Sequence, residues 1–180
     1  RLFCENTGKD EDVRMGSTLK ELSERICPSI DAHCGSGMPV LAALVDRKLV
    51  SLDYKVINPH NVRFIGYDHP DGRRTYIRSL CFVLQNVVRE MYPDKVLAID
   101  YSLPSGLYCE IREQVPMEDG RPRVYFVTDA ELEVIETRMH EIVAADMPFT
   151  KSMRSLEECE KLFSANRQSE KVNLLKSLGR

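Results

Sequence analysis

The sequence of 180 residues contains no tryptophan, and it lacks the runs and compositional biases that mark several protein classes. Its longest apolar stretches, Val40–Val45 and Leu80–Leu84, are far shorter than the ~18 residues that a membrane-spanning helix needs. Hydrophobic residues make up 43% and charged residues 29%, which excludes a disordered or collagen-like chain. The net charge of −3 excludes a uniformly basic coat for nucleic acid but permits a local basic patch. We predict a globular cytoplasmic protein with no membrane partner.

The six cysteines include no Cys-x-x-Cys pair, and most of them lie in apolar surroundings. This pattern predicts reduced thiols that pack as small hydrophobic side chains. Only Cys27, His33 and Cys34 approach the spacing of metal ligands, and their spacing matches no standard zinc pattern. His60 and His69 have no His or Cys nearby and are predicted to be surface residues. We therefore predict no metal site.

Sequence motifs for catalysis are also missing. The sequence contains no Gly-x-x-x-x-Gly-Lys-Ser/Thr, whose backbone N–H groups and lysine hold phosphates, and no Gly-x-Gly-x-x-Gly. It contains no His-Glu-x-x-His for zinc and no Gly-x-Ser-x-Gly for a serine nucleophile. These absences predict no catalytic residue and no cofactor within the 180 residues.

Periodicity and turn signals divide the chain into two small α+β units. The turn-rich segment Tyr67–Gly72, with the turn dipeptide Asp71-Gly72, predicts a boundary between domains 1–66 and 67–180. The elements expected in the first domain are strands at 1–7, 11–15, 40–45, 49–52 and 61–66 and a helix that begins after Thr18. The elements expected in the second are a helix through 77–91, a hairpin of 96–101 with 107–111, strands at 124–127 and 149–153, and helices that begin after Thr128, after Ser155 and at Glu170.

Three helices are expected to begin after the N-cap residues Thr18, Thr128 and Ser155. In each case a glutamate follows three residues after the N-cap. This spacing predicts a capping box, in which the two side chains bond each other's backbone N–H groups.

An arginine cluster, Arg73, Arg74 and Arg78, lies at the start of the helix that contains Ile77. Cations are unfavourable at this end because the helix dipole makes it positive. One interpretation is three solvated arginines that tolerate this cost. The other is an anion site, because helix N–H groups and guanidinium forks hold phosphate or carboxylate well.

The order of several motifs resembles the N-terminal half of threonyl-tRNA synthetases. The first domain resembles their TGS domain, a small ubiquitin-like β-grasp fold, through Gly16–Leu22, Ala42–Leu52 and Val62–Ile65. The second resembles the editing-type α/β domain that follows it. The motifs that carry this second resemblance are Asp68–Gly72, Tyr92–Ile99, Ser105–Tyr108, Met139–Val143, Met147–Phe149, Ser155–Glu158 and Glu170–Leu175.

The sequence departs from this family where the editing chemistry resides. The family's His-x-x-x-His positions fall on Arg78 and Phe82, neither of which binds a divalent metal or relays a proton. The family's second motif, Cys-x-x-x-His, lies past Arg180, so the domain is expected to be cut short. The resemblance places Tyr108 and Lys171 in the family's pocket. We therefore predict a non-catalytic binding groove of Arg74, Arg78, Tyr108 and Lys171.

The residue sequence of Asp71–Leu84 resembles a second family. These are bacterial uridine (nucleoside) kinases that carry a synthetase-like N-terminal region before the kinase domain. The leading hypothesis is a non-catalytic regulatory or binding module of such a protein, which binds a nucleotide, a phosphate or RNA and has its own downstream kinase domain as a partner. ATP and Mg²⁺ would serve only that kinase domain. The alternatives are the editing region of a threonyl-tRNA synthetase, a degenerate stand-alone relative, and a protein-interaction module that docks on the kinase domain.

Overall fold

The computed structural model describes residues 1–28, 37–104, 106–113, 123–166 and 168–178. Within these ranges the chain has mixed helix and strand content and two sheets, as the predicted α+β class requires. The chain packs as two compact units, residues 1–82 and 83–180. Helix α2 (Pro70–Met91) belongs to both units, so the boundary predicted after Gly66 stays a prediction.

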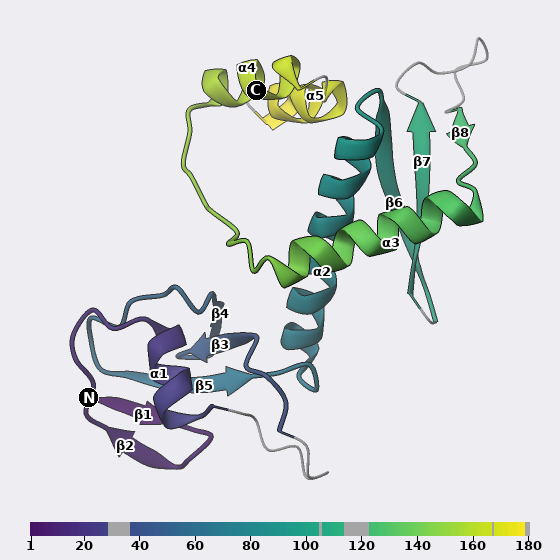
Figure 1. Cartoon of the computed structure of the whole chain (residues 1–180). Helices are drawn as coiled ribbons and strands as arrows, with labels where there is room; N and C mark the ends of the chain where they lie inside the picture. The colour runs from purple at the N-terminus through teal and green to yellow at the C-terminus, as the bar shows by residue number, and fades with distance from the viewer. Residues whose placement is uncertain (29–36, 105, 114–122, 167, 179–180) are drawn as a thin grey trace. The chain divides into compact units, whose positions relative to one another are not determined.

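Unit 1 is built on a five-stranded sheet with one helix packed on it (Figure 1). Its elements before α2 are β1 (Leu2–Cys4), β2 (Lys9–Glu11), α1 (Leu19–Ile26), β3 (Ala42–Val45), β4 (Lys48–Val50) and β5 (His60–Ile65). The strand order is β2-β1-β5-β3-β4, and β1 and β5 form the parallel pair at its centre. The neighbouring pairs are antiparallel.

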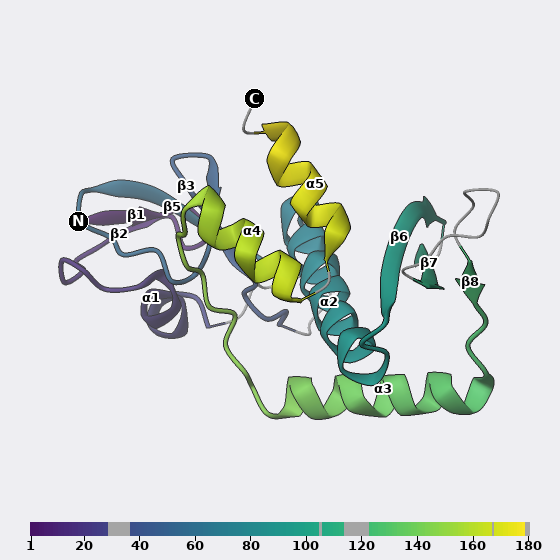
Figure 2. The same cartoon turned by 90° about the horizontal axis from the view of Figure 1, so that it is seen from above.

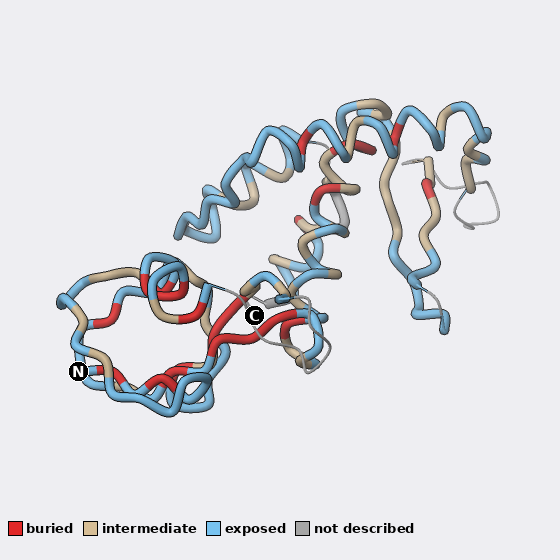
Figure 3. Tube along the Cα trace, turned by 60° about the horizontal axis from the view of Figure 1, so that its bottom comes forward, coloured by how far each residue is buried: buried red, intermediate tan, exposed pale blue. Residues whose placement is uncertain are grey.

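The core of unit 1 lies between α1 and one face of this sheet. Alternation along β1 buries Leu2 and Cys4 and leaves Phe3 on the opposite face, as the two-residue repeat of a strand requires. Leu19 and Leu22 meet them from α1, which places the buried residues of unit 1 between the helix and the strands (Figure 3).

Turns decide where the strands of unit 1 begin. The chain reverses at Gly8, whose φ is +66° and whose N–H donates to Cys4 O at 2.9 Å. The hairpin therefore closes early, and the strand predicted at 11–15 is wrong because β2 ends at Glu11. Asp46 and Arg47 form the two-residue turn between β3 and β4, both with positive φ, as a type I′ turn requires.

Unit 2 combines the second half of α2 with a three-stranded antiparallel sheet and three further helices (Figure 2). Its elements after α2 are β6 (Lys95–Leu103), β7 (Gly106–Glu113), β8 (Val124–Tyr125), α3 (Asp129–Ala144), α4 (Leu156–Ala165) and α5 (Ser169–Leu178). Val83 and Val87 of α2 pack against Ile135 and Ile142 of α3 and form its main cluster of buried side chains.

The three predicted capping boxes are confirmed at Thr18–Glu21, Thr128–Glu131 and Ser155–Glu158, each with both reciprocal hydrogen bonds. The edge strand predicted at 149–153 is wrong, because this segment pairs with no strand of the described chain. Among the described residues, no helix combines the length and the apolar character that crossing a membrane requires.

Candidate functional site

Helix α2 begins in a way that explains its first arginines. Pro70 occupies the first helical position, where its missing N–H costs nothing, and the Asp71 N–H donates to Nδ1 of His69 at 3.2 Å. Asp71 adds a negative charge near the positive end of the helix dipole. One Arg74 guanidinium nitrogen lies 2.6 Å from Asp71 Oδ1. This carboxylate therefore offsets part of the cost of a cation at this helix end.

Gly72 lies inside the first turn of α2, so the turn predicted for Asp71-Gly72 is wrong. A Cβ on Gly72 would lie 1.8 Å from the carbonyl oxygen of Gly66. The same oxygen accepts the N–H of His69 at 3.3 Å. Glycine is therefore needed at residue 72 for the close approach of two backbone segments and not for a turn conformation.

Arg78 and Phe82 lie four residues apart and therefore share one face of α2. Both are exposed, Phe82 by 62% of its surface. The Arg78 guanidinium has no ion pair or hydrogen bond within the part of the chain that the structure describes, whereas Arg74 is held by Asp71. Arg78 is thus a cation that an incoming anion reaches without displacing a protein carboxylate.

Tyr108 lies on β7 and is stacked on Tyr101 of β6, with ring centroids 4.8 Å apart and an interplanar angle of 11°. Its hydroxyl donates to Glu110 Oε1 at 2.8 Å, and this bond raises the pKa of the phenol above its ordinary value. Arg112 in turn pairs with Glu110 and Asp100. Tyr108 therefore stays protonated at neutral pH and offers a ring face and not an acid or base.

Lys171 lies on α5, half-buried, with its amine 5.4 Å from the ring centre of Phe163. Burial and the charge of Arg89 lower the pKa of the amine. The amine has no carboxylate partner among the described residues of the chain. Arg89 is thus close enough to repel the Lys171 amine, a proximity that no pattern in the sequence indicated.

The predicted groove draws its residues from both units. Arg74 and Arg78 belong to unit 1, and Tyr108 and Lys171 belong to unit 2. The structure brings the two arginines together on α2, within one helical turn of each other. The joining of all four residues in one groove stays a prediction.

Metal ligands do not gather anywhere in the described ranges, where no group of three or more His, Cys, Asp or Glu side chains could hold an ion. Cys27 is buried, while His33 and Cys34 lie outside the described residues. No disulfide joins the described cysteines, which are Cys4, Cys27, Cys81, Cys109 and Cys159.

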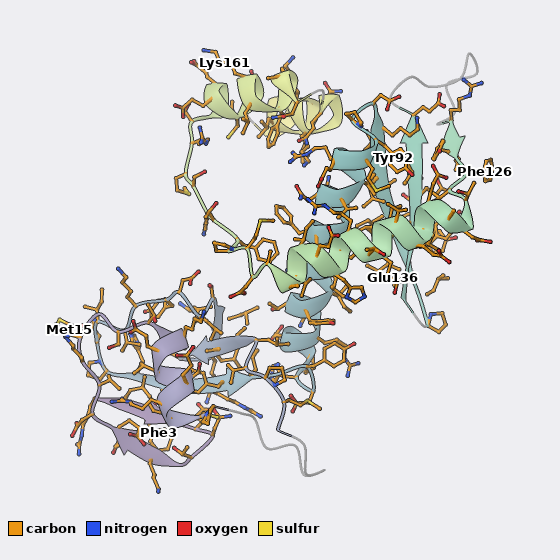
Figure 4. The ribbon with its side chains drawn as sticks, viewed as in Figure 1. Phe3, Met15, Tyr92, Phe126, Glu136 and Lys161 are labelled. Atoms are coloured by element: carbon orange, nitrogen blue, oxygen red, sulfur yellow. The ribbon has the colours of Figure 1, made fainter. Side chains whose placement is uncertain are left out.

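A polar cluster is centred on Glu131, for which the sequence predicts only a capping role. Glu131 Oε1 accepts the hydroxyls of Tyr92 at 3.0 Å and Tyr125 at 2.6 Å, and Oε2 accepts the N–H and hydroxyl of Thr128. These bonds, that of Tyr125 first, lower the pKa of Glu131 to about 2. Burial and Glu131 raise the pKa of Tyr92, which Figure 4 labels near the end of α2, to about 12. The Glu131 cluster joins the end of α2, strand β8 and the start of α3 by hydrogen bonds.

His60 is a second departure from expectation, because it is not a simple surface residue. Its Nδ1 lies 2.6 Å from Asp46 Oδ2, and its side chain is 18% exposed. A hydrogen bond from the Asn61 N–H, and then His60, lower the pKa of Asp46. These residues line an open cavity of about 340 Å³ together with Arg1, Phe3, Asp10 and Pro59. None of the four predicted groove residues lines it.

No family model matches this two-unit α+β chain, but individual known proteins are similar to it. It is similar to the threonine–tRNA ligases of Desulforamulus reducens and Acetivibrio thermocellus, at 28% identity over 175 residues in each case. Threonine–tRNA ligase 2 of Bacillus subtilis is 23% identical over 173 residues.

These matches cover 96% of this chain but only 25% of each relative, so the chain spans about a quarter of their length. The relatives support the resemblance to a part of threonyl-tRNA synthetases. They give no support to a uridine kinase parent.

Proposed function

We propose that the chain is a synthetase-type N-terminal region, with a TGS-like unit followed by an editing-type unit. It binds RNA but does not hydrolyse an aminoacyl ester. The strand order of unit 1, with a parallel central pair and one helix on one face, supports the β-grasp assignment. The threonine–tRNA ligases that match nearly the whole chain support tRNA or a tRNA-like RNA as the ligand.

The observation that carries the proposal is the exposed face of α2. Where the resemblance places two histidines, this chain has Arg78, which has no partner among the described residues, and Phe82. A guanidinium is a permanent cation that binds phosphate but is not deprotonated at neutral pH, so it cannot act as a general base. The substitution therefore retains attraction for an anionic ligand and removes a means of hydrolysing it.

The first expected result is an absence of hydrolysis. Incubated with seryl-tRNA, the chain should release serine no faster than the spontaneous rate, because hydrolysis needs a positioned acid–base group or metal. Release of radiolabelled serine measures this rate, and a tRNA-binding protein without esterase activity serves as the control. Turnover clearly above the spontaneous rate would instead indicate an active editing domain.

The second expected result concerns binding. Arg78→Ala should weaken the binding of tRNA to a similar extent across sequences, and should reduce the slope of log K against log salt by about 1. Fluorescence anisotropy of labelled tRNA measures both. Arg138→Ala is the matched control, because Arg138 is held by Glu90 and Glu141 and its loss changes the net charge equally. No RNA binding by the parent chain, or equal losses in both variants, would contradict the proposal.

The uridine kinase hypothesis rests on the sequence of Asp71–Leu84 alone. None of the relatives described above supports it. The residues that follow Arg180 decide between the two parents. A Gly-x-x-x-x-Gly-Lys-Ser/Thr motif there would support the kinase, and a Cys-x-x-x-His motif would support the synthetase.

A further inference from the structure

A second surface of unit 1 combines aromatic rings with a cation. Tyr67 follows β5, and Arg73 and Tyr76 lie on the first turns of α2, three residues apart and therefore on one side of the helix. The rings of Tyr67 and Tyr76 lie 5.2 Å apart at 88°, and the Arg73 guanidinium lies 5.3 Å from the centre of the Tyr67 ring. We name Tyr67, Arg73 and Tyr76 the Tyr76 platform.

The platform is open to solvent, since Tyr67 is 42% and Tyr76 43% exposed. The Arg73 guanidinium already lies over the ring of Tyr67, whereas the half-exposed ring of Tyr76 remains accessible to a flat ligand. Arg73 has no carboxylate partner within the described ranges, and its guanidinium lies over the ring of Tyr67. The surface thus has π faces, one uncompensated cation and no acid bound to it.

This combination fits one class of ligand better than others. Single-stranded nucleic acid binds where bases stack on aromatic side chains while nearby arginines contact the backbone. A duplex keeps its bases stacked inside and offers no face to a tyrosine. Arg78 lies on the following turn of the same helix and adds a positive charge near the platform, whereas the charge of the neighbouring Arg74 is partly offset by Asp71.

We infer that the Tyr76 platform binds an unpaired RNA segment by stacking one base on Tyr76, with Arg73 contacting an adjacent phosphate. The inference rests on the proposed function, because it specifies which part of an RNA the chain holds. It adds residues that lie outside the groove of Arg74, Arg78, Tyr108 and Lys171. The RNA feature that it selects is a single-stranded end and not a helix.

The test uses the full 180-residue chain and two probes, an RNA hairpin with a four-nucleotide 3′ overhang and the same hairpin with a blunt end. The overhang RNA should bind more tightly. Tyr76→Leu should weaken its binding roughly 5- to 150-fold, the range that loss of one base–aromatic stack gives. Tyr76→Phe should bind like the parent, because stacking needs the ring and not the hydroxyl.

Tyr54→Leu is the matched control, because it removes another exposed tyrosine of unit 1 that meets a neighbouring ring edge to face, outside the platform and the groove. It should leave the affinity for the overhang RNA unchanged.

A fluorescence experiment reports on the platform directly. Since the chain has no tryptophan, Tyr76→Trp introduces a single fluorescent indole at the platform. The overhang RNA should quench its fluorescence, and the blunt RNA should not. Thermal melts of every variant establish that the fold is retained.

Three outcomes separate this inference from the proposed function. If RNA binds and Tyr76→Leu binds it as tightly as the parent does, the platform is overturned and the proposed function stands. If overhang and blunt RNA bind equally and Tyr76→Trp responds to neither, the platform is likewise overturned. If neither probe binds at all, both the proposed function and the platform are overturned.

Discussion

Gly72→Ala should be among the most destabilising single substitutions in the chain. The added Cβ would lie 1.8 Å from the Gly66 carbonyl oxygen and 2.7 Å from its carbon, and both atoms belong to backbone. Relief requires the start of α2 to move away from the end of β5, which also strains the hydrogen bond between His69 and Gly66. We expect a loss of about 3 kcal/mol or more in the free energy of unfolding, at the upper end for overpacking.

Urea denaturation followed by circular dichroism measures this loss. Gly106→Ala is the matched control, since a Cβ at Gly106 would meet no atom within 4 Å. The control should change the free energy of unfolding by less than about 0.5 kcal/mol. Equal effects of the two substitutions would mean that the close approach of Gly72 to Gly66 is absent from the protein.

Glu131→Gln should destabilise unit 2 more than Thr128→Ala does. The alanine variant loses the hydroxyl that caps α3, a cost of about 1 kcal/mol. The glutamine variant replaces the carboxylate that accepts both tyrosine hydroxyls and the Thr128 N–H by a neutral amide that donates as well as accepts. Thermal melts at neutral pH should therefore rank the parent first, Thr128→Ala second and Glu131→Gln last.

The same carboxylate predicts a pH dependence with a defined sign. Its pKa falls from an ordinary value of 4.5 to about 2 on folding, so the unfolded chain binds the proton more readily. The stability that Glu131 supplies is therefore complete above about pH 4.5 and is lost as the pH falls toward about 2. Melts between pH 6 and 2 should show a smaller decline for Glu131→Gln than for the parent. Parallel declines in the two proteins would contradict the pKa shift.

Local sequence signals predicted the elements that local forces define. The three capping boxes were correct because a cap residue and the glutamate three residues later interact within one helical turn, whatever the rest of the chain does. The strand expected at 149–153 was wrong because a strand needs a partner, and no pattern within five residues specifies one. Gly72 shows the same limit, since its reason lies at Gly66 and not in its neighbours.

In the candidate site, too, the sequence predicted what local spacing determines and missed what strand pairing determines. Helical spacing alone placed Arg74 and Arg78 on neighbouring turns of α2, as the structure has them. The stacking of Tyr108 on Tyr101 depends on the pairing register of β6 and β7, which shifts between Ile99 and Tyr101. A shift of one residue moves a side chain to the other face of a sheet, and the sequence contained no sign of it.

The continuity of α2 restricts how the gene for this protein can change. Each residue turns an α-helix by about 100°, so inserting or deleting one codon between Val83 and Val87 would swing one of these side chains through that angle, away from Ile135 and Ile142. Substitutions on the exposed face leave this phase intact, whereas a change of length does not. Related genes should therefore differ in sequence along this stretch but hardly ever in its number of codons.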